Sequence, residues 1–387
     1  MQQIRIPAAL MRGGTSKGLF FRGDALPRDP ALRDRVLLRA IGSPDPYRKQ
    51  IDGLGGATSS TSKVVIVSRS ARAGCDVDYL FGAVAIDAPV IDWSGSCGNL
   101  VAGVGPFAIE EGLMPASEGM TVVRIWQANT GKRIVAHVPT RDGAPLVAGD
   151  CRMDGVPFSG AEIRVEFLDP GGAGGGALLP TGRIVDRLHV AGVGDIEASL
   201  VDAGNPTVFV RAGDIGLAAT ELAPAIDGDP RLLARLEAIR ASGAVAMGLA
   251  ASAADATARR PATPKLAFVA PPVGYETSAG ERLAADDIDV TARIMSMGRL
   301  HHAFTGTGSV AAAVAGALPG SIVAQAKRTT PDGEPIRIGH PAGRLEVGAT
   351  VVQREGRWVA EKAVMRRTAR RLMEGSVLVP AEVLISI

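Results

Sequence analysis

Two glycine-rich junctions, roughly two hundred residues apart, most constrain what this chain can fold into. Residues 95–100 read Gly-Ser-Cys-Gly-Asn-Leu, residues 306–310 read Gly-Thr-Gly-Ser-Val, and each leads into an apolar run. Each junction predicts the beginning of a helix, where amide groups without helical partners and the helix dipole favour an anion. We therefore expect two carboxylate-binding loops, one carrying a thiol at Cys97 and the other a hydroxyl at Thr307.

Other segments repeat in the same order as the junctions, which indicates an internal duplication. They are two strand–turn–strand patterns (123–135 and 336–347), two lysines that precede apolar strands (Lys63 and Lys265), and two acidic segments (76–79 and 287–290). Four matches in one order predict two similar halves.

The length of the chain agrees with two domains, because 387 residues exceed what one hydrophobic core usually holds. We expect a first domain over residues 1–185 and a second over 186–387, with residues 370–387 packing back on the first. A run of glycines at 171–176 predicts an interdomain hinge or a surface loop, since ordering so many glycines is costly.

Composition excludes several classes of protein. The 42 basic and 40 acidic residues nearly cancel, so no positive electrostatic potential that would attract nucleic acid is expected. Only 4% of residues are aromatic, so no surface on which bases could stack is expected either. No segment reaches the roughly 18 consecutive apolar residues of a membrane span. Residues 1–7 lack a signal-peptide core, which predicts a cytoplasmic protein. Three scattered cysteines fit neither a disulfide framework nor a metal site.

The 48 glycines and 25 prolines favour many short strands over long helices. Strands are predicted at 64–68, 77–87, 121–126, 133–138, 207–211, 336–338 and 345–353. Helices are predicted at 29–41, 229–242 and 361–374, in addition to one after each junction. The helix after Asn99 carries almost no charge before Glu110, so we expect it to be buried all round.

Cys97 and Lys63 are the candidates for proton chemistry. The beginning of a helix favours the thiolate, which makes Cys97 a candidate acid or base; the alternative is a small buried residue in a tight turn. Lys63 follows a polar stretch and precedes an apolar strand, so a desolvated amine there could accept a proton; the alternative is a lysine at a solvated strand edge. Cys75 and Cys151 have no such setting and are taken as structural.

Three further motifs have candidate roles. Residues 12–18 differ from a phosphate-binding loop in the spacing of Lys17, so a carboxylate is the better ligand for their hydroxyl and amide groups. Residues 204–207 are a candidate counterpart in the second half. His301 and His302 lack a third ligand at metal spacing, which favours a structural or substrate-contact role.

Several long motifs of this sequence resemble those of the PrpF family over essentially the whole chain. They are residues 11–18, 42–56, 61–63, 97–99, 104–108 and 367–375. The resemblance implies an α+β fold of the diaminopimelate-epimerase type, with two similar strand-rich barrels, each around a central helix, and the active site between them. It also implies an isomerase of unsaturated tricarboxylic acids that uses no metal or organic cofactor.

By that resemblance, Lys63 is the leading catalytic base and Cys97 a second acid or base. Removal of an allylic proton gives a dienolate, and return of the proton gives a geometric isomer or a tautomer. The expected substrate-binding residues are Thr15, Ser16, Ser62, Gly98, Asn99, Asn205, Thr307, Gly308 and Ser309. The amide groups of Gly98, Asn99, Gly308 and Ser309 would stabilise the developing carboxylate charge.

One departure from the epimerase pattern bears on the reaction. A racemising site uses two thiols, and Thr307 is taken to stand where the second one would be expected. A threonine hydroxyl is too weak an acid for that role, so a single-base allylic shift fits better than amino-acid racemisation.

Three functional hypotheses follow. The first is isomerisation of 2-methyl-trans-aconitate to the cis form in the methylcitrate route of propionate breakdown. The second is tautomerisation of 4-oxalomesaconate, or a related methylitaconate-type reaction. The third is a non-catalytic carboxylate-binding protein, against which the presence of Lys63 and Cys97 argues. A small tricarboxylate is the expected partner, no nucleic acid or membrane is expected, and a homodimer is the candidate assembly.

Overall fold

The structure is a computed structural model that describes residues 2–331 and 333–384. The chain divides into two compact units. The first comprises Met1–Arg152, Phe158–Val165 and Arg367–Ile387, and the second comprises Met153–Pro157 and Glu166–Arg366. No helix in the described part of the chain is long and apolar enough to cross a membrane.

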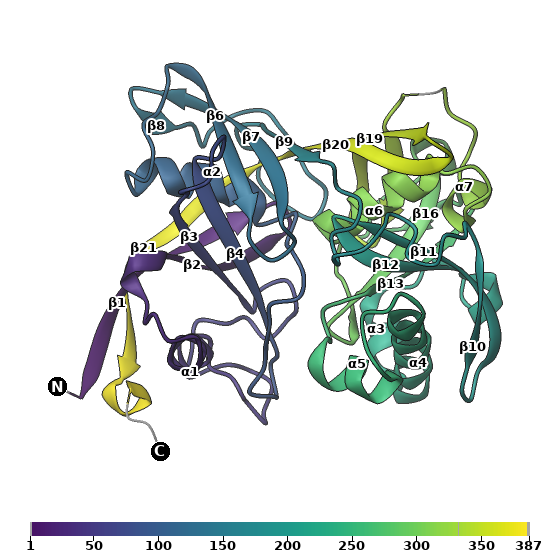
Figure 1. Ribbon diagram of the computed structural model, residues 1–387, viewed down its shortest axis with the longest axis horizontal. Helices are drawn as coiled ribbons and strands as arrows, with labels where there is room; N and C mark the ends of the chain where they lie inside the picture. The colour runs from purple at the N-terminus through teal and green to yellow at the C-terminus, as the bar shows by residue number, and fades with distance from the viewer. Residues whose placement is uncertain (1, 332, 385–387) are drawn as a thin grey trace. The chain divides into compact units, whose positions relative to one another are not determined.

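The first unit is rich in strands and contains two main helices (Figure 1). Its helices are α1 (Pro30–Ile41) and α2 (Val101–Glu110). Its strands are β1 (Gln3–Gly13), β2 (Ser16–Arg22), β3 (Lys63–Arg69), β4 (Val77–Val84), β5 (Ile91–Asp92), β6 (Gly119–Gln127), β7 (Lys132–Arg141), β8 (Ala144–Pro145) and β21 (Ala369–Pro380), and β9 (Ile163–Leu168) begins in it.

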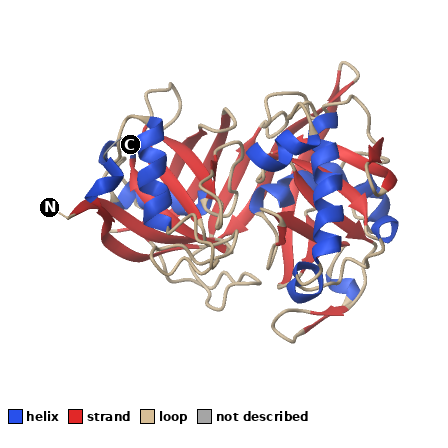
Figure 2. Cartoon of the chain, turned by 90° about the horizontal axis from the view of Figure 1, so that it is seen from below, coloured by secondary structure: helices blue, strands red, loops and turns tan. Residues whose placement is uncertain are grey.

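The second unit has the same character with more helices (Figure 2). Its helices are α3 (Ala223–Asp227), α4 (Pro230–Ala246), α5 (Ala253–Arg259), α6 (Gly306–Gly316) and α7 (Ile322–Ala326). Its strands are β10 (Asp186–Val190), β11 (Gly194–Ala203), β12 (Asn205–Arg211), β13 (Lys265–Ala270), β14 (Tyr275–Glu276), β15 (Arg282–Leu283), β16 (Val290–Ser296), β17 (Arg299–Leu300), β18 (Ile336–His340) and β19 (Gly343–Arg354), with nearly all of β20 (Arg357–Arg367).

Strand pairing confirms the internal duplication. In the first unit β1–β2 is antiparallel, β2–β3 parallel, β3–β4 antiparallel, β4–β6 parallel and β6–β7 antiparallel. The second unit repeats this order with β11–β12, β12–β13, β13–β16, β16–β18 and β18–β19. Both predicted hairpins are therefore present.

The parallel pairs explain where the helices lie, because parallel neighbours need a crossover connection. In the first unit α1 connects β2 to β3 and α2 connects β4 to β6. Side chains alternate along β2, so Phe20 contacts Phe107 of α2 while Leu19 and Phe21 pack in the cluster that includes α1. Helices α4 and α6 are the corresponding crossovers of the second unit.

Helix α2 is the central helix of the first unit, as its lack of charge predicted. It contacts β1, β4, β7, β8 and β21, and every residue from Val101 to Ile109 is buried. In the second unit α6 contacts β11, β12, β18 and β19, and its residues from Gly306 to Ala315 are buried.

An acidic residue and an arginine mark the same place in both units and correct the sequence comparison. Asp76 and Arg124 exchange backbone hydrogen bonds, with Asp76 N to Arg124 O at 2.7 Å and Arg124 N to the Asp76 carboxylate at 2.7 Å. Asp289 and Arg337 do the same at 2.7 and 2.8 Å. Asp76 therefore matches Asp289, and not Asp287 as the order of the two acidic segments predicts.

The helix predicted at 361–374 is wrong, since these residues lie in β20 and β21. Strand β20 pairs with β19, and β21 pairs with β1 along most of its length, from Gly13 opposite Ala369 to Gln3 opposite Pro380. Ala363, Met365 and Ala369 are buried against these neighbours, so tertiary pairing outweighs local helix propensity.

The glycine run at 171–176 lies within the second unit and is no free hinge. Gly171 forms a β-bridge with Ala203, Gly172 N donates to Asp202 O at 2.8 Å, and Gly174 N donates to the Asp202 carboxylate. A side chain on Gly174 would approach Pro206 to 2.9 Å, which accounts for glycine at this position. Residues 166–185, which the sequence grouped with the first half, accordingly belong to the second unit.

Candidate active site in the first unit

Lys63, Ser16 and Cys97 form a buried cluster in the first unit. Lys63 Nζ donates to Ser16 Oγ at 3.0 Å and to Cys97 Sγ at 3.4 Å. The ammonium also lies 5.7 Å from the centre of the Phe81 ring. All three side chains are buried, Lys63 with 6% of its surface exposed, so the solvated strand-edge alternative for this lysine is wrong.

Each member of the cluster stands at the end of a regular element. Lys63 is the first residue of β3, Ser16 the first of β2, and Cys97 precedes α2 by one turn. Ser16 and Lys63 are neighbours because β2 and β3 run parallel, with Leu19 opposite Val64. The crossover through α1 therefore brings together residues far apart in the sequence.

Hydrogen bonds on three sides hold Cys97 in place. Its Sγ accepts from Leu100 N at 3.4 Å, and its carbonyl O accepts from Val101 N at 3.1 Å and from the Tyr79 hydroxyl at 3.1 Å. Burial raises the pKa of Tyr79 well above its usual range. Tyr79 therefore anchors the loop and takes no part in proton transfer near neutral pH. The sequence analysis missed it, although its place in a strand that runs toward the junction is a usable signal.

Thr15 and Asn99 lie beside this cluster, as expected, and Arg367 joins them. Asn99 Nδ2 donates to Thr15 Oγ1 at 3.0 Å, and Arg367 Nε donates to Asn99 Oδ1 at 3.3 Å. Arg367 has 3% of its surface exposed. Its burial lowers its pKa to about 10, against the opposing effect of the Cys151 and Cys97 thiols, so the guanidinium remains charged at neutral pH.

Ser62 precedes Lys63 in the chain, but its hydroxyl group bonds to Gln50 and not to the lysine. Ser62 Oγ donates to Gln50 Oε1 at 2.7 Å, and Gln50 Nε2 donates to Ser43 Oγ at 2.9 Å. Gln50 Oε1 also accepts from Ala57 N at 2.7 Å. Ser62 thus fastens the loop of residues 43–57 next to the lysine.

The second unit contains a related cluster around Lys265, the first residue of β13. Lys265 has 8% of its surface exposed and its Nζ donates to Ser296 Oγ at 3.3 Å. Asn205 Nδ2 donates to Thr307 Oγ1 at 2.8 Å, an amide–hydroxyl bond like that between Asn99 and Thr15.

The residue that corresponds to Cys97 in the second unit is Thr305, which corrects the expectation that it is Thr307. Thr305 Oγ1 accepts from Gly308 N at 3.2 Å and its carbonyl O accepts from Ser309 N at 2.9 Å. These are the contacts that Cys97 makes with Leu100 and Val101. Thr307 accordingly matches Asn99.

The same contacts bear on the amide groups expected to bind a carboxylate. The amides of Gly308 and Ser309 are engaged by Thr305, because a helix cap satisfies the third and fourth amides that follow it. Ser309 Oγ donates to Gly306 O at 2.7 Å. Within the described residues, Cys97 and Thr305 accept no hydrogen bond from the glycine amide that follows each of them, that of Gly98 or Gly306.

His301 and residues 12–18, which were further candidates for binding, make contacts that hold the fold together. His301 Nδ1 accepts from Ala303 N at 3.1 Å and its ring stacks on His302, with 4.8 Å between centroids. Residues 12–18 form the β1–β2 hairpin, which excludes a phosphate loop leading into a helix. In the part of the chain that the structure describes, no disulfide joins Cys75, Cys97 or Cys151.

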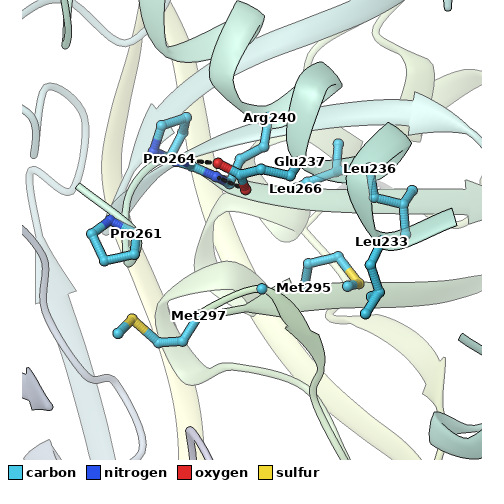
Figure 3. A pocket seen from close by; sticks show the side chains of 10 residues that line it. Leu233, Leu236, Glu237, Arg240, Pro261, Pro264, Leu266, Met295 and Met297 are labelled. Atoms are coloured by element: carbon cyan, nitrogen blue, oxygen red, sulfur yellow. Dashed lines mark hydrogen bonds and ion pairs between the residues drawn. The ribbon is translucent and has the colours of Figure 1, made fainter. Parts of the chain in front are cut away.

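A small cavity in the second unit lies on the other side of β13 from Lys265. Figure 3 shows its lining, which includes Pro261, Leu266 and Met295 together with the Glu237–Arg240 ion pair. Side chains alternate along a strand, so Leu266 and Lys265 point to opposite faces. Arg240 is fully engaged by Glu237 and by carbonyl groups of residues 256, 260 and 263. This cavity of about 10 Å³ has room for one water molecule at most.

Duplicated strand-rich units, each wound around a central helix, define a protein of the diaminopimelate-epimerase-like class. A solved hydroxyproline epimerase from Agrobacterium vitis shares this fold at 14% identity, with a TM-score of 0.54 over 97% of this chain and 92% of that one. The chain belongs to the PrpF family, since the family model described as PrpF protein matches residues 3–380.

Two proteins are similar over nearly their whole length. The 2-methyl-aconitate isomerase of Shewanella oneidensis is 53% identical over 98% of this chain and 98% of its own. The solved structure of a methylitaconate-delta-isomerase is 45% identical, with a TM-score of 0.78 over 100% of this chain and 98% of that one.

Proposed function

We propose that this protein is a cofactor-independent isomerase of unsaturated tricarboxylic acids, with 2-methyl-trans-aconitate as its substrate and the cis isomer as its product. The observation that carries the proposal is the buried amine of Lys63 within hydrogen-bonding distance of both Ser16 Oγ and Cys97 Sγ. The 53% identity to a 2-methyl-aconitate isomerase supports the choice of substrate.

Lys63 acts as the base in this proposal. In its neutral form Nζ accepts the allylic proton, the C–H bond breaks, and the electron pair enters a dienolate whose charge reaches a carboxylate oxygen. The former double bond gains single-bond character and rotates. Return of the proton from Nζ before rotation restores the substrate. After rotation, the Cys97 thiol gives its proton to the same carbon to form the geometric isomer, or to the other end of the allylic system to shift the double bond, and the Lys63 ammonium then re-protonates the thiolate.

Cys97 serves as the second acid or base. Its Sγ lies 3.4 Å from Lys63 Nζ, so a proton can pass between the two groups without another carrier. The amide of Gly98 and the polar side chains of Thr15, Ser16 and Asn99 lie around the same cluster. They are suited to hold a substrate carboxylate and to stabilise its growing charge.

A shift of the double bond is the second candidate reaction. The similarity to a methylitaconate-delta-isomerase favours it specifically, because that protein is named for such a shift. Tautomerisation of 4-oxalomesaconate requires the same proton abstraction with a different return site.

Proton NMR of the purified protein in deuterated solvent tests these reactions directly. Incubation with 2-methyl-trans-aconitate is expected to give the cis isomer, with deuterium at the allylic position. Conversion of methylitaconate, a dicarboxylate, or of 4-oxalomesaconate alone would replace the first choice of substrate. Unchanged spectra with all three of these acids would overturn the isomerase and favour the carboxylate-binding protein.

Lys63→Ala provides the variant for the same experiment, with Lys132→Ala as its matched control. The first removes the proposed base, and the second removes a lysine at the β6–β7 hairpin of the same unit. We expect allylic exchange to disappear in Lys63→Ala and to persist in Lys132→Ala. Equal exchange in both variants would overturn the assignment of the base.

Two further expectations belong to this proposal. The same proposal places the protein in the cytoplasm, where cell fractionation followed by immunoblotting tests it. A homodimer stays a prediction, and light scattering of the purified protein tests it.

A further inference from the structure

Arg367 and Thr368 brace the loops of the candidate site from the far end of the chain. The segment from Arg367 onward belongs to the first unit, where Thr368 O accepts from Gly14 N at 2.9 Å and from Arg12 Nη1 at 3.0 Å. Arg367 itself reaches Asn99. One short segment thus contacts both the Gly13–Ser16 turn and the loop that follows Cys97.

The packing of this region is tight. A side chain on Gly14 would lie 2.7 Å from Asn99 Oδ1 and 3.1 Å from Arg367 Cδ. Asn99 has 1% of its surface exposed and Arg367 has 3%. The hydrogen bonds between these groups are therefore made away from bulk water, where donor and acceptor roles matter most.

The chemistry of Arg367 fixes the direction of a hydrogen-bond chain. A guanidinium carries only donors, so the amide atom of Asn99 that faces it must be Oδ1. The Asn99 amino group then faces Thr15 and donates to Oγ1. Because Thr15 Oγ1 accepts this bond, the hydrogen of the Thr15 hydroxyl points away from the Asn99 amino group.

Ser16 is placed in the same way by a different donor. Its Oγ accepts from Lys63 Nζ at 3.0 Å, so its hydrogen also points away from that bond. Within residues 2–331 and 333–384, neither the Thr15 nor the Ser16 hydroxyl donates to a protein acceptor. Two adjacent hydroxyl donors are suited to an acceptor-only ligand, which a carboxylate is.

We propose that Arg367 is a positioning residue that, through Asn99, turns the Thr15 hydroxyl into a hydrogen-bond donor for a substrate carboxylate. This inference rests on the proposed function for the identity of the ligand, and it assigns a role to a motif that the proposed reaction leaves unused. Arg367 does not touch the substrate; it sets which way Thr15 donates.

A double-mutant cycle of Arg367→Met and Thr15→Val tests the inference. Each single change is expected to lower kcat/KM by about tenfold to a hundredfold, mainly through KM, because a hydrogen bond to a charged group is lost. Since both changes remove the same bond, the double variant is expected to be no more than about threefold worse than the weaker single variant. Effects that multiply would overturn the proposal.

Two matched variants separate positioning from folding. Arg367→Lys keeps a donor-only cation and is expected to recover part of the lost affinity, which a purely structural defect would not do. Arg370→Met changes an exposed arginine on β21 and is expected to leave kcat and KM unchanged. Thr15→Val alters a half-buried turn residue, so it tests the chain of bonds even if Arg367→Met fails to fold.

Calorimetric titration with tricarballylate, a saturated tricarboxylate, keeps this inference distinct from the proposed function. If the protein shows no turnover but both Arg367→Met and Thr15→Val bind tricarballylate more weakly, the isomerase is overturned and the carboxylate site is supported. If the protein turns over substrate and the losses of kcat/KM in the two single variants multiply in the double variant, the isomerase is supported and the role of Arg367 is overturned. Unchanged tricarballylate affinity in both variants would also overturn that role.

Discussion

Cys97 and Thr305 occupy the same position before the central helices of their units. Each accepts a hydrogen bond from the amide three residues later, Cys97 Sγ from Leu100 and Thr305 Oγ1 from Gly308, and each carbonyl accepts from the amide four residues later. The two helices therefore begin alike, while the capping groups differ in acidity. The thiol has a lysine 3.4 Å away and can exchange a proton, whereas the hydroxyl is restricted to capping.

The Cys97→Ser variant separates capping from proton transfer. Serine keeps an acceptor for Leu100 N but is a far weaker acid, so we expect isomer formation to fall by about 10²–10⁴-fold, the usual contribution of a general acid or base. Allylic exchange with deuterated solvent should continue, because Lys63 still removes the proton. Proton NMR measures both rates in one sample. Loss of exchange equal to that in Lys63→Ala, or undiminished isomerisation, would show that Cys97 is not the second acid.

The Thr305→Val variant tests the cap in the second unit. Valine keeps the shape of threonine and removes the oxygen that accepts from Gly308 N, so the free energy of unfolding should fall by about 1 kcal/mol. Thr305→Ser retains the hydroxyl and serves as the control, with less than about half that loss. Urea titrations followed by circular dichroism give both values. Equal stability of the two variants would argue against a capping role.

The duplicated units could be predicted from short patterns of residue types, and Lys63 and Cys97 could be named together from the resemblance to the PrpF family. The sequence alone could not show which residue of the second half matches which residue of the first. Thr305 and Thr307 both occur in the second junction, and only the hydrogen bonds of Gly308 and Ser309 distinguish them. Residues 361–374 were predicted as a helix, whereas they lie in β20 and β21, whose pairing with β19 and with β1 at the opposite end of the chain leaves no local signal. Arg367 was quoted as a motif without a role, since its contact with Asn99 exists only after that pairing forms.

Gly13 lies where the turn of residues 13–16 meets the loop after Cys97. A Cβ at this position would lie 2.6 Å from Asn99 O and 2.9 Å from Leu100 Cα, and these backbone atoms cannot move without shifting the beginning of α2. We expect Gly13→Ala to destabilise the protein by about 1–3 kcal/mol, the usual cost of overpacking, and to lower isomerase activity as well.

The control for Gly13→Ala is Gly213→Ala, which has open space around the added carbon and an ordinary φ. Its unfolding free energy should stay within about 0.5 kcal/mol of the parent protein. Thermal denaturation and the NMR assay together measure the two effects. A Gly13→Ala protein as stable and active as Gly213→Ala would contradict the close approach of the turn and the loop.

Asp289 and Asp76 make the same backbone contacts, but only Asp289 has a close ion pair, 2.7 Å from Arg337 against 3.6 Å for Asp76 and Arg124. Burial alone would raise the pKa of Asp289, yet the hydrogen bonds and charge of Arg337 outweigh it and hold that pKa below the usual 3.8. A carboxylate with a lowered pKa stabilises the folded state above about pH 4, and this contribution is lost as pH falls through the lowered value.

Asp289→Asn should therefore cost about 2 kcal/mol at pH 7, where a charged hydrogen bond is removed, and the difference from the parent should shrink below pH 4. Asp76→Asn, with its looser pair, should cost less at pH 7. Urea titrations from pH 7 to pH 3 measure these differences, and a cost of Asp289→Asn that stayed constant with pH would contradict the assigned ion pair.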